Sequence, residues 1–205
     1  MKLLFFKSGP LNVNTYFLVN EDTGEAIVID GGENYKLVKQ TEKDYGFKIK
    51  AVLLTHAHFD HAGNAARLQK DGAIIYVGTK DADKLLNGGT LSEDFGRKFD
   101  SFTPDHTVDD GDVISACGID VKVIATPGHT DGSLTFSVGD MLFTGDTLFF
   151  ESVGRTDFPT GDREELIKSV KKLFALSGDY RVFPGHEEFT TLSHERECNT
   201  FIDYD

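Results

Sequence analysis

Short apolar runs alternate with polar, glycine-containing turns through the first third of the chain. Apolar runs of this length, bounded by turn residues, are typical of β-strands. We therefore predict four strands, at residues 2–6, 13–19, 26–29 and 51–54. Between the last two, apolar residues recur at helical spacing over residues 34–45, and Gly46 follows them. This pattern predicts a crossover helix that ends at a left-handed glycine.

Helical and strand patterns continue to alternate along the chain. Helices are predicted from residue 61 or 62 to 70 and over 79–86, with a strand at 73–77 between them. Residues 87–112 mix Gly, Asp, Ser and Phe without a clear period, which predicts a mobile or lid-forming loop. Further strands are predicted at residues 119–125, 133–138, 141–144 and 181–183.

One more helix is predicted after the glycine-rich loop that ends near residue 160. Asp162 and Glu165 resemble a helix-capping pair, and an apolar stripe follows them on one helix face. The stripe consists of Leu166, Ile167, Val170, Leu173 and Phe174. A terminal helix is predicted after the last strand. Because strands and helices interleave in both halves without a linker or repeat, we predict a single α/β domain over residues 1–205.

Composition and charge limit the partners of the protein. The formal net charge is -13 and the calculated pI is near 4.9, whereas a nucleic-acid-binding protein normally carries a basic face. The apolar run at residues 3–6 is too short for a signal sequence, and no stretch has the length of a membrane span. We expect a cytoplasmic protein that binds a small molecule and neither nucleic acid nor a membrane. The oligomeric state stays open.

Four residues that could carry chemistry are expected to have other roles. Cys117 and Cys198 lie far apart and match no zinc or redox spacing, so we expect reduced, packed thiols. His106 is expected in a turn, bonded to backbone. His194 is expected on a polar helix, exposed to solvent.

The remaining five histidines and Asp146 occur in four segments of one design. In each segment an apolar strand runs into a Gly, Pro or Thr turn that presents a potential metal ligand. The densest segment, THAHFDH, supplies His56, His58, Asp60 and His61. The others end at His129, Asp146 and His186. Strands that end this way bring their ligands to one edge of a sheet, where rigid elements can fix a metal.

These side chains supply only nitrogen and oxygen donors, which suits Zn, Fe or Mn. His56, His58 and His129 can bind one ion and Asp60, His61 and His186 a second, while the Asp146 carboxylate bridges the two. Two divalent ions roughly 3.5 to 4 Å apart can generate hydroxide at neutral pH and polarise a carbonyl oxygen. We take Zn as the first candidate metal. Asp60 and Asp146 are the candidate catalytic residues, since Asp60 can also orient the hydroxide.

The segments THAHFDH, PGHTDG, FTGD and FPGH resemble the metal-binding motifs of the metallo-β-lactamase superfamily. The resemblance covers nearly the whole chain and implies an αββα four-layer sandwich with the metals at one edge. It implies a structural role for Asp30 in VIDGG. The bridging position is an aspartate, Asp146, and not a cysteine. In this respect the chain resembles glyoxalase II and similar hydrolases more than the antibiotic-degrading branch, which has a cysteine ligand.

The segment GDTLFFESVGRTDFPTGD resembles small glyoxalase II-like hydrolases, which cleave thioesters such as S-lactoylglutathione. Persulfide dioxygenases, which use one iron ion, contain a similar GRTDF segment, so that activity is an alternative. A metal-binding sensor or scaffold without turnover is a second alternative. The FPGH turn and the TTLSHERECN run after it favour the hydrolase, and we predict a two-metal thioester hydrolase.

Substrate contacts are predicted around the same loop. Arg155 either binds a substrate carboxylate or pairs with Asp157. Phe149, Phe150 and Phe158 either line the entrance or pack in the core. Only a short stretch follows His186, whereas full-length glyoxalase II continues into a helical region with cationic glutathione contacts. We therefore expect modest activity on a broad range of acyl thioesters.

Overall fold

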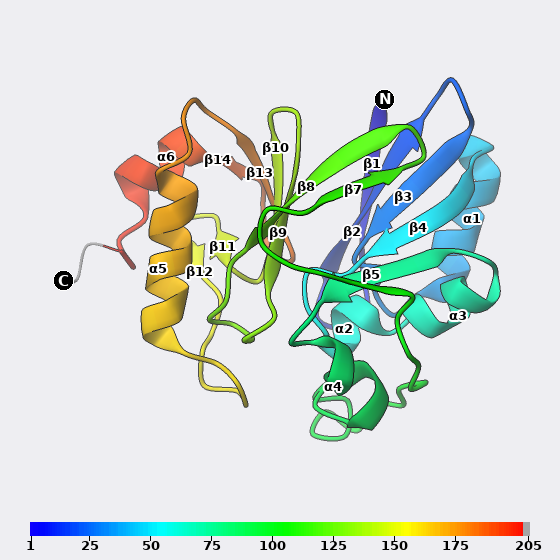
Figure 1. Ribbon diagram of the computed structural model, residues 1–205, viewed down its shortest axis with the longest axis horizontal. Helices are drawn as coiled ribbons and strands as arrows, with labels where there is room; N and C mark the ends of the chain where they lie inside the picture. Colours follow the sequence, from blue (N-terminus) through cyan, green and yellow to red (C-terminus); the bar gives the residue numbers. More distant parts are fainter. Residues whose placement is uncertain (203–205) are drawn as a thin grey trace.

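Two six-stranded sheets lie face to face in the computed structural model, which describes residues 1–202 (Figure 1). The first sheet has the order β1 to β6, and the second has the order β14-β13-β10-β9-β8-β7. The first contains β1 (Lys2–Ser8), β2 (Val13–Asn20), β3 (Glu25–Ile29), β4 (Lys48–Leu53), β5 (Ile74–Gly78) and β6 (His106–Val108). The second contains β7 (Val113–Ala116), β8 (Ile119–Ala125), β9 (Leu134–Val138), β10 (Met141–Gly145), β13 (Arg181–Pro184) and β14 (Thr190–Thr191).

Six helices and a small hairpin complete the described part of the chain. The hairpin pairs β11 (Leu148–Phe149) with β12 (Ser152–Val153). Four helices cover the first sheet: α1 (Tyr35–Tyr45), α2 (Phe59–Ala62), α3 (Ala65–Lys70) and α4 (Ala82–Asn87). The second sheet is covered by α5 (Arg163–Phe174) and α6 (Leu192–Cys198).

Strand alternation divides the apolar side chains among three cores. In β3, Val28 faces the first group of helices, while Ile27 and Ile29 face the other sheet. In β10, Phe143 faces the first sheet and Leu142 faces α5 and α6. Successive side chains of a strand point to opposite faces, so each sheet is buried on both sides. The αββα four-layer sandwich implied by the family resemblance is confirmed.

The predicted helix signals are present at α1 and α5. Asn34 Oδ1 accepts a hydrogen bond from the Leu37 amide at 3.1 Å, and Gly46 adopts the left-handed conformation with φ 70°. Asp162 Oδ1 accepts from the Glu165 amide at 3.0 Å. These caps satisfy backbone groups that a helix end leaves without partners.

The structure differs from the predicted elements in several regions. The helix predicted to start at residue 61 or 62 begins at Phe59 and is interrupted between Ala62 and Ala65. At the break, the side-chain Nδ2 of Asn64 donates to the Gly31 carbonyl at 3.0 Å. The predicted loop at 87–112 contains β6, whose three residues pair with β5. The following β7, the hairpin β11–β12 and β14 were not predicted either, because two- to four-residue strands leave little periodicity.

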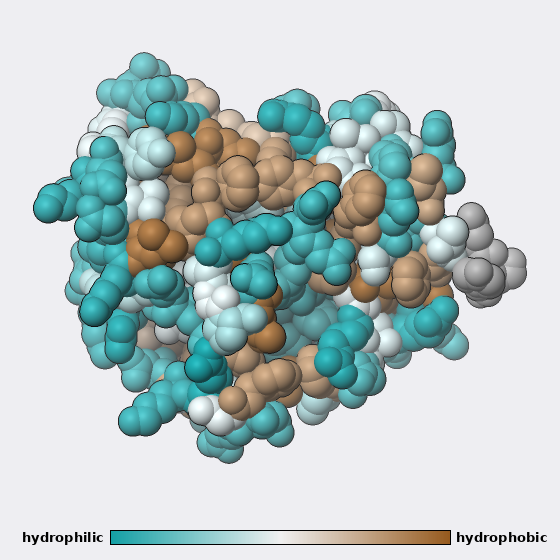
Figure 2. All heavy atoms as spheres, turned by 180° about the vertical axis from the view of Figure 1, so that it is seen from behind, coloured by the Kyte–Doolittle hydropathy of each residue, from teal (hydrophilic) through white to brown (hydrophobic). Residues whose placement is uncertain are grey.

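The rear surface is mixed, with hydrophilic side chains interrupted by apolar patches (Figure 2). Exposed aromatic residues include Phe5 and Phe189, whose rings meet edge to face at 4.7 Å. Among residues 1–202, no helix is both long enough and apolar enough to cross a bilayer.

Candidate metal centre

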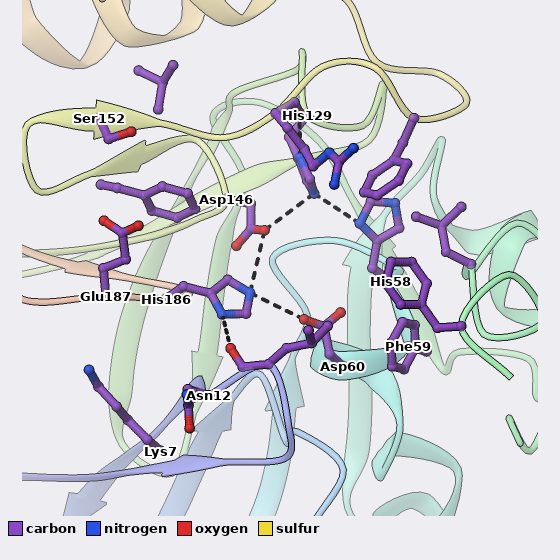
Figure 3. Close-up of a pocket in the computed structure, with 17 residues that line it drawn as sticks. Lys7, Asn12, His58, Phe59, Asp60, His129, Asp146, Ser152, His186 and Glu187 are labelled. Atoms are coloured by element: carbon purple, nitrogen blue, oxygen red, sulfur yellow. Dashed lines mark hydrogen bonds and ion pairs between the residues drawn. The ribbon is translucent and has the colours of Figure 1, made fainter. Parts of the chain in front are cut away.

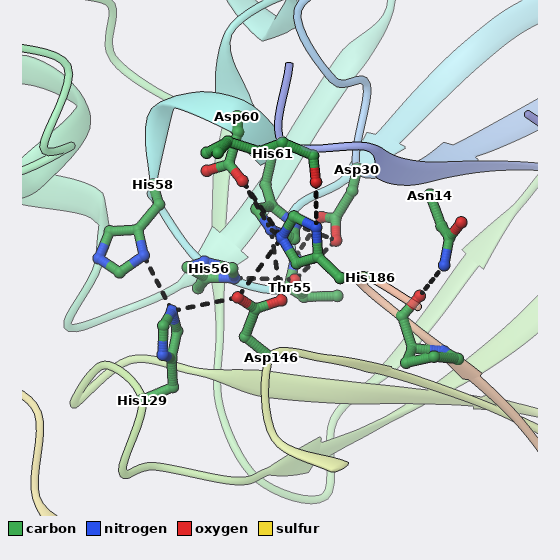
Figure 4. Close-up of polar contacts among 12 residues, drawn as sticks. Asn14, Asp30, Thr55, His56, His58, Asp60, His61, His129, Asp146 and His186 are labelled. Atoms are coloured by element: carbon green, nitrogen blue, oxygen red, sulfur yellow. Dashed lines mark hydrogen bonds and ion pairs between the residues drawn. The ribbon is translucent and has the colours of Figure 1, made fainter. Parts of the chain in front are cut away.

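The four ligand-bearing segments meet at one edge of the two sheets (Figure 4). The THAHFDH segment follows β4, and His129 follows β8 after a short turn. Asp146 directly follows β10, and His186 follows β13. Because β10 and β13 are parallel, and β8 and β10 are both antiparallel to β9, these three strands of the second sheet end on the same side. All seven predicted ligands are therefore brought together.

The ligand atoms fall into three overlapping groups, within each of which all atoms lie within 4.8 Å of one another. The groups are His56, His58 and His129; Asp60, His61 and His186; and His56, His61 and Asp146. The first two are the triads that we assigned to separate ions, and the third joins them. Figure 4 shows Asp146 between the two triads.

Close approaches between potential ligands mark both triads. His129 Nε2 lies 2.9 Å from His58 Nδ1 and 3.4 Å from Asp146 Oδ2. His186 Nε2 lies 3.2 Å from Asp60 Oδ2 and 3.3 Å from His61 Nε2. Imidazole nitrogens and carboxylate oxygens that face each other at these separations can bind the same cation.

Two buried atoms support the fit to metal ions. Five buried side-chain atoms of the described residues have no hydrogen-bond partner, and two of them, His56 Nε2 and Asp146 Oδ1, lie at this centre. A buried polar atom without a partner costs about 1–3 kcal/mol, so a native structure normally satisfies it. Both atoms belong to the group that joins the triads, and divalent cations at this centre would satisfy them.

The outward ring nitrogens of three histidines face carboxylate or carbonyl oxygens. His61 Nδ1 donates to Asp30 Oδ2 at 2.8 Å, and His186 Nδ1 donates to the Leu11 carbonyl at 2.9 Å. His129 Nδ1 donates to the Arg155 carbonyl at 2.7 Å. These bonds place the proton on the outward nitrogen and leave the inward one free to bind metal.

His56 is oriented through Thr55. The Thr55 hydroxyl donates to Asp30 Oδ2 at 2.7 Å, so its oxygen can accept from His56 Nδ1 at 3.1 Å. The Thr55 amide also donates to Asp30 Oδ1 at 2.8 Å. Asp30 is buried and thus orients both His56 and His61 from behind, in agreement with the structural role that we expected for it.

The two halves of the centre differ in charge. Burial, together with the neighbouring His61, holds the pKa of His56 well below its usual value, and burial beside His129 lowers the pKa of His58 to about 3. Burial opposes protonation of His61 as well, but Asp60, Asp146 and Asp30 outweigh it and raise its pKa to about 10. In the metal-free protein His56 and His58 are therefore neutral, whereas His61 is an imidazolium that faces carboxylates.

A glycine allows the ligands to approach one another. A Cβ atom on Gly185 would lie 2.4 Å from Asp146 Oδ1 and 2.7 Å from the His61 ring. A side chain at this position would therefore displace two potential ligands.

A pocket of about 590 Å³ opens over the centre (Figure 3). Of the predicted substrate residues, Arg155, Phe149 and Phe158 line it, whereas Phe150 stacks on His194 outside the pocket. The Arg155 guanidinium binds both carboxylate oxygens of Asp157, at 2.7 and 2.6 Å, and stacks over Phe158. The pairing with Asp157 is thus present, and the side chain still reaches the pocket wall.

Sequence patterns missed several pocket residues. Leu91 and Phe95, from the predicted loop at 87–112, line the apolar side. Lys7, Asn12 and Glu187 line the opposite side (Figure 3). Asn12 and Glu187 have positive φ, at 53° and 65°, which is uncommon outside glycine. A strained turn beside a candidate metal-binding residue indicates a functional role, but backbone strain cannot be predicted from the sequence.

The other candidates lie outside the centre. His106 begins β6 and stacks on Tyr76, so the predicted turn is wrong. His194 is on α6 as predicted, with its side chain 36% exposed. Both cysteines are free, Cys117 partly buried and Cys198 exposed, so the expected packing is wrong for Cys198.

Comparison with known proteins identifies the fold and its relatives. The family model described as the metallo-β-lactamase superfamily matches residues 8–186. Hydroxyacylglutathione hydrolase GloC of Haemophilus influenzae is 35% identical over 193 residues, which cover 90% of this chain and 91% of GloC. The crystal structure of BLEG-1 B3 metallo-β-lactamase matches with a TM-score of 0.90 and 32% identity, covering 98% and 99% of the chains. The crystal structure of TTHA1623 in a di-iron-bound form matches with a TM-score of 0.87 and 31% identity, and the match covers 97% of this chain and 99% of TTHA1623.

Proposed function

Because the chain belongs to the metallo-β-lactamase superfamily and has a complete set of candidate ligands, we propose that it is a two-metal hydrolase of small acyl thioesters. The observation that carries this proposal is the pair of triads on either side of Asp146, all with nitrogen or oxygen donors, at the floor of an open pocket. The similarity to GloC, named a hydroxyacylglutathione hydrolase, supports S-lactoylglutathione and related thioesters as the substrate class.

The candidate ligands would bind two separate ions. His56, His58 and His129 would hold one ion, Asp60, His61 and His186 the other, and Asp146 would contact both. Bound divalent ions supply Lewis-acid polarisation of a carbonyl and lower the pKa of water. Asp60 is buried, which favours its neutral form, but His61 and His186 outweigh the burial and hold its pKa well below the usual value. The carboxylate therefore stays ionised and can accept a hydrogen bond from water in the pocket. The histidines keep fixed orientations through their outward bonds.

The pocket offers two different surroundings to a substrate. Phe95 and Phe158 form part of an apolar wall on the His58 side, which suits an acyl chain. Lys7, Asn12 and Glu187 give the opposite side charge and hydrogen-bonding groups, which suits a polar thiol carrier. A thioester carbonyl between these walls would lie over the metal ligands.

Zinc is the first candidate metal, and iron and manganese are compatible with the same donors. TTHA1623 is described in a di-iron-bound form, so iron belongs in the same experiment. The metal-free protein should therefore be reconstituted with each of the three metals separately.

The experiment compares three reactions on the reconstituted protein. Steady-state hydrolysis of S-lactoylglutathione should exceed hydrolysis of a chromogenic cephalosporin, which is included because BLEG-1 is named a β-lactamase. Oxygen uptake with glutathione persulfide should stay at background. Oxygen uptake that requires iron would instead identify the dioxygenase. No turnover in any of the assays, with two metal ions bound, would identify a sensor or scaffold.

A further inference from the structure

A second cluster of potential metal ligands lies outside the candidate metal centre. Glu151, His194 and Cys198 place one ligand atom each within 4.8 Å of the others. Glu151 is in the turn of the hairpin β11–β12, and the other two are on α6. We propose that these three residues form a separate site for a thiophilic divalent cation such as Zn²⁺.

Two of the three side chains are already oriented. His194 Nε2 lies 2.9 Å from Glu151 Oε1, and the His194 ring stacks on Phe150 at 5.1 Å with an interplanar angle of 9°. Stacking fixes the plane of the imidazole and the carboxylate fixes its direction. Little side-chain entropy remains to be lost when a cation binds.

The backbone of Glu151 is held by a buried carboxylate. Glu151 has φ 49°, an uncommon conformation for a residue with a side chain, and its amide donates to both oxygens of Glu195 at 3.1 and 3.0 Å. Glu195 is fully buried, and its carboxylate also accepts from the Thr190 hydroxyl and from the side-chain Nδ2 of Asn199. The strained turn is therefore determined by its surroundings, and it directs the Glu151 side chain toward α6.

Helical spacing adds the thiol. His194 and Cys198 are four residues apart on α6, so they lie on one face, one turn apart. An imidazole, a carboxylate and a thiolate together match the ligand preference of zinc, and three protein ligands leave one position for water. Glu151 and Cys198 are exposed, so a cation can reach the site from solvent.

A cation here would connect α6 to the wall of the pocket. Phe149, Ser152 and Val153 of the hairpin line the pocket, and Leu148 packs in one core with Leu192 of α6. Occupancy of the site would therefore stiffen one side of the pocket without touching the seven ligands of the metal centre.

The test uses protein already loaded with two equivalents of zinc, to which Co²⁺ is added near pH 7.5. We expect a thiolate-to-cobalt charge-transfer band, which the metal centre cannot produce because it contains no sulfur ligand. The band should be absent in Cys198→Ser, and the apparent cobalt affinity should fall at least about tenfold in Glu151→Gln. Cys117→Ser is the matched control and should retain the band, because burial raises the pKa of the Cys117 thiol to about 11.

Three outcomes would overturn the site. They are no band in the wild type at saturating cobalt, a band that persists in Cys198→Ser, and a band per chain that grows with protein concentration, which would indicate a cation shared between chains. Thermal unfolding without cobalt should be equal in wild type and Cys198→Ser, because the thiol is exposed. Equal midpoints of thermal unfolding in the two proteins would show that Cys198→Ser loses the band because it lacks a ligand, and not because it fails to fold.

Discussion

Asp30 shows how one residue outside the ligand set can control the metal centre. Its carboxylate accepts hydrogen bonds from the Thr55 amide, the Thr55 hydroxyl and His61 Nδ1. Its φ is 52°, a conformation that asparagine also tolerates. Asp30→Asn therefore keeps the backbone and replaces one acceptor oxygen with a donor group.

We expect Asp30→Asn to weaken metal binding at the His61 triad by about 10- to 100-fold, the usual effect of losing a partner behind a metal ligand. The His56, His58 and His129 triad should change less, because Asp30 reaches it only indirectly, through Thr55 and His56. Competition with a chromophoric chelator measures both affinities. Equal affinities in variant and wild type would show that Asp30 does not orient the ligand.

Lys7 and Arg155 are the two cationic side chains of the pocket, and they differ in availability. Arg155 is engaged by Asp157, whereas Lys7 has no ion-pair partner among residues 1–202. We expect Lys7→Gln to lower kcat/KM for S-lactoylglutathione about tenfold or more, the effect of one charge-assisted contact. Arg155→Gln, the matched variant, should lower it by less than about threefold. A larger loss in Arg155→Gln would assign the substrate carboxylate to the arginine.

At the scale of elements, the metal centre depends on how closely the turns after β10 and β13 approach each other. Gly185 lies against Asp146 and His61, so Gly185→Ala should displace both ligands and reduce bound metal below two ions per chain. Gly139→Ala is a suitable control. Its φ of 58° would strain an alanine, but no atom lies within 4 Å of the added Cβ. The control should lose about 1–2 kcal/mol of stability and keep its metal. Elemental analysis and thermal unfolding separate the two effects.

The sequence predicts the elements that carry chemistry better than those that surround it. All seven candidate ligands could be found because their segments each follow an apolar strand and a Gly, Pro or Thr turn. The break between α2 and α3 could not, because it depends on a bond from Asn64 to Gly31, far away in the chain. Lys7 and Glu187 were missed for the same reason: the β1–β2 turn and the turn after β13 meet only in the folded protein.

At the scale of the whole molecule, proton and metal binding are linked. The proton on His61 is bound below its pKa of about 10 and must leave before the inward nitrogen can bind metal. Lowering the pH therefore weakens the His61 triad, by up to about tenfold per pH unit for one displaced proton. His58, with a pKa of about 3, needs no such exchange above pH 5.

We therefore expect metal to leave in two steps as the pH is lowered at a fixed concentration of free zinc. The His61 triad should empty first, and the His56, His58 and His129 triad should keep its ion at lower pH. Elemental analysis after equilibrium dialysis at pH 8, 7, 6 and 5 gives the two steps. Simultaneous loss of both ions would contradict the difference in charge between the two halves.

The central claim is that two metal ions at this centre hydrolyse thioesters. Its most direct test is the rate of S-lactoylglutathione hydrolysis, measured while zinc, iron or manganese is added stepwise to the metal-free protein. The account predicts a rate that rises until two equivalents are bound per chain and then stays constant. Full activity at one equivalent, or no hydrolysis with two equivalents of any of the three metals bound, would contradict it.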